Sequence, residues 1–349
     1  MRAYQLTAAT EDFDFRDVPE PEPGPGEVVI KVGGAGVCHS DLHLKEWPAE
    51  QIEQMGLQLP FTLGHENAGW VDAVGTGVTE VEVGQPVAVY GPWGCGTCKR
   101  CRLGQENYCE HPERQVGFGG GLGRDGGMAP KMLVPSARLL VPLGDLDPID
   151  AAPLSDAALT PYHAIKRSLP KLTAGSTAVV IGVGGLGHLG VELLRELSPA
   201  RIIAVDLDDN KLEHALSIGA HEAVKSDDKA LETIRGMTGG LGAEGVFDFV
   251  GAQPTVELAA GVAKVMGDLS IVGIGGGELA VSFFAVPYEV SIQTTYWGSV
   301  TELMELLDLA RQGRIRVTST RFPLDEAPEA YRRLAAGELT GRAVIMPNA

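Results

Sequence analysis

The chain has 349 residues, more than a single hydrophobic core usually reaches, so we expect two domains. Its 46 Asp and Glu against 28 Lys and Arg give a net charge of −18, which repels nucleic acid and anionic lipid. No apolar run approaches the ~20 residues that span a bilayer, and the N-terminus lacks the apolar core of a signal peptide. These properties predict a cytoplasmic protein with reduced thiols that binds neither nucleic acid nor membranes.

Residues 1–155 have the pattern of a β-rich domain. Short apolar runs at Val28–Val32, Gly69–Val74 and Pro86–Val89 are separated by turns rich in Gly and Pro, such as Pro19–Gly26. This punctuation is typical of a barrel rather than of a helical repeat. We therefore expect a barrel-like first domain.

Within this part, the fifth cysteine of the chain, Cys38, is a candidate ligand of a catalytic metal. A catalytic zinc keeps three protein ligands, which can be far apart in the sequence, and one open position. Taken alone, a single Cys after an apolar strand is more often an inert core residue. Spacing does not choose its partners, for which the candidates are His39, His43, His65, His163 and Asp156.

The other four cysteines form one short run, Cys-x2-Cys-x2-Cys-x7-Cys, made of Cys95, Cys98, Cys101 and Cys109. Four thiolates this close match the closed tetrahedral cage of a structural Zn²⁺, which leaves no position for a substrate. An iron–sulfur cluster uses similar ligands, but its usual runs have other spacings and often a Pro after the last Cys, where this chain has Glu110. The spacing therefore favours zinc over an iron–sulfur cluster, disulfides or an incidental grouping.

After Pro161 the pattern changes to alternating strands and helices. Strands are predicted at Thr177–Gly182, Arg201–Asp206, Gly245–Val250 and Leu269–Ile274, and helices at Val191–Leu197, Lys211–Ile218 and Thr255–Val265. Such alternation indicates βαβ units on a parallel sheet. The last segment adds helices at Glu302–Arg311 and Ala327–Ala335 and a strand at Ala343–Pro347. A nucleotide-binding domain is thus expected between two unequal parts of the β-rich domain.

The first strand of this second part leads into a Gly-x-Gly-x-x-Gly turn that contains Gly185 and Leu186. Gly182 allows the tight turn, Gly184 lets the backbone approach a pyrophosphate, and Gly187 lets helix and strand pack closely. The N–H groups and positive dipole end of the following helix face the phosphates. The motif alone is weak evidence in a chain with 46 glycines, but here it follows a buried strand and opens a helix.

Asp206 is predicted to bind the adenosine ribose of the dinucleotide. It lies 19 residues after Gly187, at the end of the second strand, where a carboxylate bonds both ribose hydroxyls. No Arg lies near it to meet a 2′-phosphate, so the sequence favours NAD over NADP. The alternative role for Asp206 is the N-cap of the helix that contains Asn210 and Lys211.

Together, these motifs resemble the zinc-dependent medium-chain alcohol dehydrogenase family. The segments in the family's order are Gly36–Asp41, Gly64–Glu66, the four-Cys run, Ala152–Leu154 and Gly182–Gly187. The resemblance covers essentially the whole chain, which looks most similar to bacterial NAD-dependent secondary-alcohol dehydrogenases. It implies an α/β fold: a GroES-like β-barrel catalytic domain, a Rossmann domain with a doubly wound parallel sheet, and an active site in the cleft between them.

By this resemblance, residues 1–156 and 297–349 form the catalytic domain, with a structural-zinc lobe at about 91–112, and residues 157–296 bind NAD. The family's catalytic-zinc ligands fall on Cys38, His65 and Asp156. The third is commonly Cys, so Asp156 is a departure that resembles an acidic variant of this subgroup. Zn²⁺ with Cys⁻, neutral His and Asp⁻ is a neutral site, and a hard carboxylate is a reasonable zinc ligand; the alternative is a merely structural Asp.

The resemblance also assigns residues to catalysis and to cofactor binding. Ser40 matches the family's hydroxyl relay, His43 its relay histidine, and Glu66 the acid beside the zinc. Arg342 matches an arginine that reaches the cofactor pyrophosphate, and Lys211 is a candidate contact to the adenosine ribose. The residues that fit an apolar substrate pocket by position are Trp47, Phe61, Tyr296 and Trp297. Each of these residues also has an ordinary interpretation as a turn cap, a surface charge or a packed core side chain.

The expected activity is the interconversion of secondary alcohols and ketones by hydride transfer to and from NAD, with one catalytic and one structural zinc per subunit. A homotetramer is expected because bacterial members of the family are mostly tetramers that pair their Rossmann sheet edges. One alternative is a polyol or sugar dehydrogenase of the same superfamily, whose pocket needs more polar groups than we find. The other is a cofactor-binding protein without turnover, which the intact Cys38, His65 and Ser40 oppose.

Overall fold

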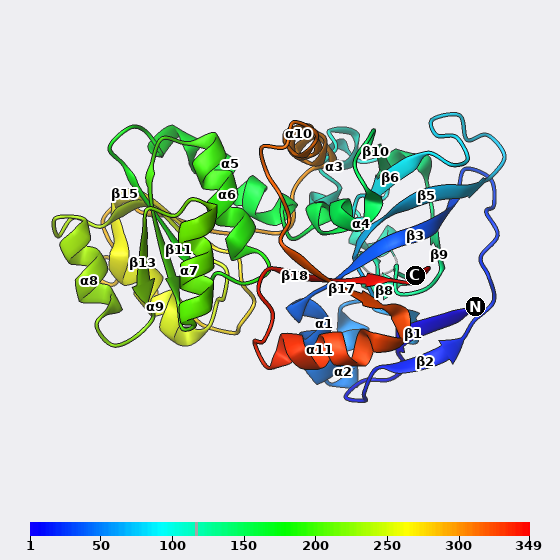
Figure 1. The fold of residues 1–349 in the computed structure, drawn as a ribbon, viewed down its shortest axis with the longest axis horizontal. Coiled ribbons are helices and arrows are strands. Elements are labelled where there is room, and N and C mark those ends of the chain that lie inside the picture. Colours follow the sequence, from blue (N-terminus) through cyan, green and yellow to red (C-terminus); the bar gives the residue numbers. More distant parts are fainter. Residues whose placement is uncertain (116–117) are drawn as a thin grey trace. The chain divides into compact units, whose positions relative to one another are not determined.

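The computed structural model describes residues 1–115 and 118–349, and the chain divides into two compact units (Figure 1). Unit 1 comprises Met1–Leu159, Trp297–Gly313 and Val317–Ala349, and unit 2 comprises Thr160–Tyr296 and Arg314–Arg316. Each unit has its own sheets. Among the described residues, no helix is both long and apolar enough to cross a bilayer.

The main sheet of unit 1 has seven strands in the order β10-β6-β5-β3-β18-β17, with β9 also paired to β3. Their bounds are β3 Val28–Val37, β5 Glu66–Val74, β6 Pro86–Val89, β9 Lys131–Val134, β10 Leu140–Pro142, β17 Ser319–Pro323 and β18 Arg342–Met346. The central strand, β3, is buried at every position except Lys31. The three strands predicted here lie within β3, β5 and β6, and the predicted C-terminal strand is β18, which begins one residue earlier.

Smaller elements complete unit 1. They are β1 Arg2–Leu6, β2 Asp14–Asp17, β4 Phe61–Thr62, β7 Gly119–Gly120, β8 Gly123–Arg124, α1 His39–Glu46, α2 Ala49–Gln54, α3 Lys99–Arg102, α4 Pro148–Ala151, α10 Val300–Arg311 and α11 Ala327–Ala335. Sequence patterning missed α1 and α2 because they lack an apolar stripe: α1 buries Asp41 and Leu44, and α2 buries Ile52. A capping box starts α1, since the side chain of Asp41 accepts a hydrogen bond from the N–H of Cys38.

Unit 2 contains one sheet of six parallel strands in the order β13-β12-β11-β14-β15-β16. Counted along the chain this order is 3-2-1-4-5-6, which is the Rossmann arrangement. The strands are β11 Thr177–Ile181, β12 Arg201–Asp206, β13 Glu222–Lys225, β14 Ala243–Asp248, β15 Ala263–Ile271 and β16 Ser291–Thr294, and the helices are α5 Leu159–Ser168, α6 Gly187–Leu197, α7 Asp209–Ile218, α8 Ala230–Met237 and α9 Gln253–Val262. The α/β fold predicted for this part is confirmed.

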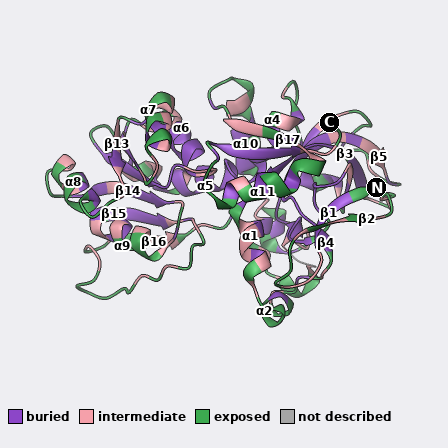
Figure 2. Ribbon diagram, turned by 60° about the horizontal axis from the view of Figure 1, so that its bottom comes forward, coloured by how far each residue is buried: buried purple, intermediate pink, exposed green. Residues whose placement is uncertain are grey.

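The core of unit 2 lies between its sheet and the helices that pack on it. It contains the apolar side chains of β11 and β12, such as Val179 and Ile203, together with Ile234 of α8 and Ala259 of α9. Figure 2 shows the central strands as buried and the outer faces of the helices as exposed. This burial on both faces explains why the strands read as continuous apolar runs in the sequence.

The predicted bounds around β14 and β15 are wrong, for local reasons. The structure ends β14 at Asp248 rather than at Val250, because the Asp248 side chain accepts hydrogen bonds from the N–H groups of Val250 and Gly251 in the following turn. Strand β15 spans Ala263–Ile271 rather than the predicted Leu269–Ile274. Helix α9 ends at Val262 rather than at Val265, because Ala263 has extended backbone angles. Neither the end of β14 nor the start of β15 is marked by a change in the spacing of apolar residues, so the sequence does not reveal them.

Candidate functional site

Three neighbouring strand ends bring the candidate metal ligands of unit 1 together. Strand β3 ends directly before Cys38, β5 begins at Glu66 directly after His65, and β18 begins at Arg342. Gly36 of β3 lies opposite Glu66 in the antiparallel β3–β5 ladder, and β18 pairs with the other side of β3. The register of these three strands therefore places their functional side chains at one end of the sheet.

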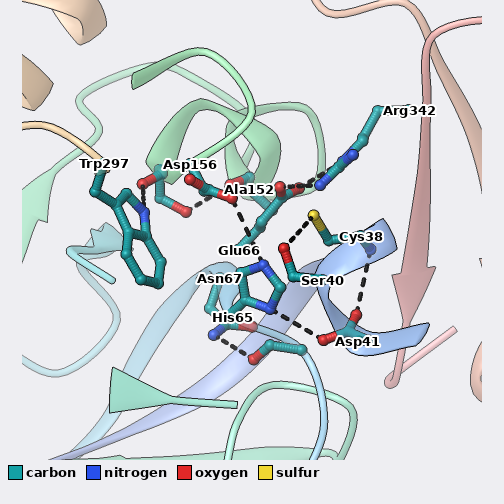
Figure 3. A network of polar contacts seen from close by, with 12 residues as sticks. Cys38, Ser40, Asp41, His65, Glu66, Asn67, Ala152, Asp156, Trp297 and Arg342 are labelled. Carbon is teal, nitrogen blue, oxygen red and sulfur yellow. Dashed lines mark hydrogen bonds and ion pairs between the residues drawn. The ribbon is translucent and has the colours of Figure 1, made fainter. Parts of the chain in front are cut away.

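Cys38, His65, Glu66 and Asp156 form a buried cluster whose ligand atoms all lie within 4.8 Å of one another (Figure 3). Asp156 follows the 3₁₀ turn Ala152–Ser155, and its Oδ2 lies 3.5 Å from Nε2 of His65. A thiolate, an imidazole and a carboxylate are the donors that zinc binds in proteins. The residues fit a zinc site, and they include each of the three catalytic-zinc ligands predicted from the sequence.

Glu66 is held in this cluster by a buried ion pair. Nε of Arg342 donates to Oε2 of Glu66 at 2.9 Å, and Nη2 donates to Oε1. Arg342 is only 2% exposed, so the pair is shielded from solvent and bidentate. Burial raises the pKa of Glu66 to about 7, even though the charge of Arg342 lowers it. Arg342 thus stabilises the charged form of Glu66, while its predicted contact to a cofactor pyrophosphate stays a prediction.

Gly36 makes room for this ion pair. A Cβ atom at residue 36 would overlap the carboxylate of Glu66, and the Gly36 backbone does not have a positive φ. The requirement for glycine therefore comes from the close approach of the Glu66 side chain rather than from backbone conformation.

Asp41 is a functional residue that the sequence analysis did not single out. It is fully buried, and its Oδ1 lies 3.1 Å from Nδ1 of His65 while its Oδ2 accepts a hydrogen bond from the N–H of Cys38 at 3.2 Å. A carboxylate at Nδ1 fixes the tautomer of a ligating histidine and leaves Nε2 for the metal. The sequence signal for Asp41 was its position three residues after Cys38. In a capping box, the side chain at this position accepts a hydrogen bond from the backbone N–H of the N-cap residue.

The two predicted relay residues lie on α1. Oγ of Ser40 is 3.4 Å from Sγ of Cys38, so the hydroxyl borders the cluster. His43 is one turn further along, where Nδ1 lies 3.6 Å from the Glu46 carboxylate and the side chain is 32% exposed. Ser40 thus borders the candidate metal ligands, and His43 has access to solvent.

The residues predicted for a substrate pocket differ in their surroundings. Trp297 is buried, its indole N–H donates to the carbonyl of Ser155 at 3.2 Å, and its ring packs edge-on to His65 with centroids 5.9 Å apart. Phe61 is a core residue at 1% exposure, whereas Trp47 is half-buried and Tyr296, in unit 2, is 39% exposed. A pocket role for these residues stays a prediction.

The four-Cys run is assembled as one tetrad of free thiols. The sulfur atoms of Cys95, Cys98, Cys101 and Cys109 lie within 4.8 Å of one another, and none of them is in a disulfide. Backbone N–H groups point at the sulfurs, for example from Cys98 to Sγ of Cys95 at 3.4 Å. Hydrogen bonds, first from the hydroxyl of Thr97, lower the pKa of Cys95 to about 5. The tetrad fits the structural zinc that its spacing predicts.

In unit 2, the Gly-rich turn has the geometry that its sequence predicts. Gly182 has a φ of +84°, a Cβ at Gly187 would overlap the carbonyl of Gly182, and a Cβ at Gly184 would meet nothing within 4 Å. As predicted, Gly182 forms the tight turn, Gly187 allows helix and strand to pack closely, and Gly184 leaves the approach to the backbone open.

Asp206 lies at the end of β12 beside this turn. Its Oδ2 accepts from the N–H of Val183 at 2.7 Å and its Oδ1 from the N–H of Asp208 at 3.0 Å. The alternative role of Asp206 as a helix N-cap is wrong, because Asp208 caps α7 by accepting from the N–H groups of Asn210 and Lys211. Ribose contacts of Asp206 and of the Lys211 side chain stay predictions.

Comparison with known proteins identifies the family. Residues 24–145 match the alcohol dehydrogenase GroES-like domain, and residues 185–312 match the zinc-binding dehydrogenase domain. An NAD-dependent alcohol dehydrogenase of Sulfurisphaera tokodaii is 34% identical over 99% of this chain and 100% of its own length. The chain belongs to the zinc-dependent medium-chain alcohol dehydrogenase family. The family and the GroES-like and Rossmann folds expected from the sequence are therefore confirmed.

Two further relatives of this family bear on the site. A D-arabinose 1-dehydrogenase (NADP(+)) of Saccharolobus solfataricus is 34% identical over 99% of this chain and 97% of its own length. The crystal structure of the alcohol dehydrogenase from Aeropyrum pernix superimposes with a TM-score of 0.91 at 37% identity, covering 99% of this chain and 100% of that one. Full-length relatives of this dehydrogenase family thus include both alcohol and sugar enzymes.

We expect Gly36→Ala to lower the free energy of unfolding by about 1–3 kcal/mol, because the new methyl group displaces the Glu66 carboxylate from Arg342. Urea unfolding measures this loss. The control is Gly236→Ala in α8, where a Cβ meets nothing within 4 Å and alanine suits a helix. Equal stability of Gly36→Ala and the wild type would contradict the close approach of Glu66 to β3.

Proposed function

We propose that this chain is an NAD-dependent alcohol dehydrogenase that interconverts secondary alcohols and ketones, with one catalytic and one structural zinc per subunit. The observation that carries the proposal is the buried cluster of Cys38, His65 and Asp156 with the Ser40 hydroxyl at its border. The charges of Cys38 and Asp156 together balance a divalent cation, so the site is neutral with zinc bound. Cys95, Cys98, Cys101 and Cys109 would hold the structural ion.

When bound, zinc supplies Lewis-acid polarisation of the alcohol oxygen, and NAD supplies the hydride acceptor. The protein's own groups then have to move the hydroxyl proton. Ser40 borders the ligand cluster, and its Oγ accepts that proton while releasing its own. His43 lies on the same face of α1, three residues on; it takes up the proton that Ser40 releases and passes it to solvent through its partly exposed ring.

The cofactor is proposed to be NAD rather than NADP. Asp206 presents its carboxylate beside the Gly-rich turn and next to Asp208, whereas the carboxylate of Asp209 is paired with Lys225. A 2′-phosphate would be repelled there, whereas ribose hydroxyls donate hydrogen bonds to a carboxylate.

Sugar oxidation is the second candidate, because a full-length relative is a D-arabinose 1-dehydrogenase. Apolar side chains favour the alcohol: the indole of Trp297 packs on His65, and Trp47 follows the helix that holds Ser40. Secondary alcohols bind such surfaces with a single polar group at the metal, whereas a sugar leaves several hydroxyls unpaired.

We expect 2-butanol to reduce NAD faster than sorbitol, glucose or D-arabinose does, because the apolar indole of Trp297 beside His65 gives extra hydroxyls no partner. NADH absorbance measures the rates, with NADP as the comparison cofactor. A higher rate on a sugar would replace the alcohol assignment with the sugar one. Retained cofactor binding with no turnover of any substrate, in wild type as in Cys38→Ser, would indicate a binding protein instead.

Removing the Ser40 hydroxyl should lower kcat by about 10²-fold, since proton transfer then lacks its first acceptor. The measurement is steady-state oxidation of 2-butanol by Ser40→Ala, with metal content determined in parallel. Ser40→Thr is the matched control, because it keeps a hydroxyl and should keep most of the activity. An unchanged kcat in Ser40→Ala would exclude Ser40 from the relay.

We also propose a homotetramer in which the free edge of the unit 2 sheet forms one contact. Strand β16 is the last strand of that sheet, and the segment before it exposes Phe283 at 73% and Phe284 at 86%. Exposed aromatic side chains next to an open strand edge favour pairing with a second copy.

We also propose a cytoplasmic location, where thiols stay reduced, as the free thiols of the tetrad do in this structure.

We expect sedimentation velocity at micromolar concentration to show a tetramer, and Phe284→Glu to dissociate it by placing a charge in the apolar contact. Exposed Leu241→Glu serves as the control, because Leu241 lies outside this segment. A wild-type monomer would contradict the proposed assembly.

A further inference from the structure

Tyr331 is connected to the candidate metal centre by one carboxylate. It lies in α11, is buried at 4% exposure, and its hydroxyl donates a hydrogen bond to Oδ2 of Asp41 at 2.7 Å. The other oxygen of Asp41 contacts Nδ1 of His65 at 3.1 Å. A side chain 290 positions further along the chain than Asp41 is thus two hydrogen bonds away from a predicted zinc ligand.

The Asp41 carboxylate depends on these donors because it has no access to water. Its exposure is 0%, and its donors are the Cys38 N–H at 3.2 Å, the Tyr331 hydroxyl at 2.7 Å and the His65 ring. A buried carboxylate that loses a donor either reorients or takes up a proton. The hydroxyl of Tyr331 makes the shortest of the three contacts, so its loss affects the orientation of Asp41 most.

The Tyr331 ring is itself fixed by aromatic neighbours. Its centroid lies 5.0 Å from that of Phe13 and 6.0 Å from that of Tyr4. Burial and the charge of Asp41 raise the pKa of Tyr331 well above its usual range, so the hydroxyl remains a donor. The aromatic cluster therefore presents one fixed donor to Asp41.

We propose that Tyr331 is a positioning residue of the metal centre: its hydroxyl fixes Asp41, and Asp41 in turn fixes the ring of His65 with Nε2 directed at the metal. The inference rests on the proposed function, because it requires a catalytic metal at Cys38, His65 and Asp156. It extends the centre beyond its ligands, and it gives the C-terminal helix α11 a role in retaining the metal.

The test follows metal release from the holoenzyme into a chelating dye. We expect Tyr331→Phe to release the catalytic metal about 10-fold faster or more, as loss of support for a ligating histidine does elsewhere. Release from the four-Cys tetrad should not change, which provides an internal reference. Cys38→Ser, which lacks a ligand, identifies the catalytic phase. In the cobalt-substituted enzyme, Tyr331→Phe should also shift the visible absorption bands of the catalytic ion.

Tyr4→Phe is the matched control. It removes a hydroxyl from the same buried aromatic cluster but leaves the contact between Tyr331 and Asp41 in place. Wild-type release rates in Tyr331→Phe would overturn the positioning role, and so would equal acceleration in Tyr4→Phe, which would assign the effect to ring packing. A wild-type enzyme that releases metal only from the tetrad would overturn the proposed catalytic centre itself, and the role of Tyr331 with it.

Discussion

The site depends on balancing acidic groups that the fold buries at one end of a sheet. Arg342 neutralises Glu66 by a bidentate ion pair, and Asp41 is supported by three hydrogen-bond donors. With a divalent cation bound, the ligands Cys38 and Asp156, each deprotonated, would together match its charge. Burying such charges without compensation is costly, so the arrangement itself favours a bound metal.

The register of the strands fixes the positions of these charged side chains. Cys38 directly follows β3, and Glu66 and Arg342 begin the two strands that pair with β3, so their spacing is set by backbone pairing rather than by flexible loops. Gly36 allows the Glu66 side chain to lie directly on β3. Asp156 reaches the same place from a 3₁₀ turn, and its direct ligation stayed open in the sequence because an Asp stands where the family commonly has a Cys.

Sequence reasoning succeeded where the signal is local. The four-Cys spacing, the Gly-rich turn and the apolar strands each lie within a short window, and the structure assembles them as expected. It failed where the signal is a contact between distant residues. Asp41 acquires its role by touching His65 and Tyr331, and no period or spacing encodes either contact. The burial of Arg342 against Glu66 likewise follows from pairing between β18 and β3.

The central claim is that the cluster of Cys38, His65 and Asp156 holds the metal that activates the alcohol. The most direct measurement follows NADH formation from 2-butanol while a chelator removes metal and the metal remaining per chain is determined. The account predicts that activity falls in proportion to the loss of the first equivalent of metal per chain, and that it returns when Zn²⁺ is added back. Full activity after that equivalent has been removed, with the tetrad still loaded, would contradict it.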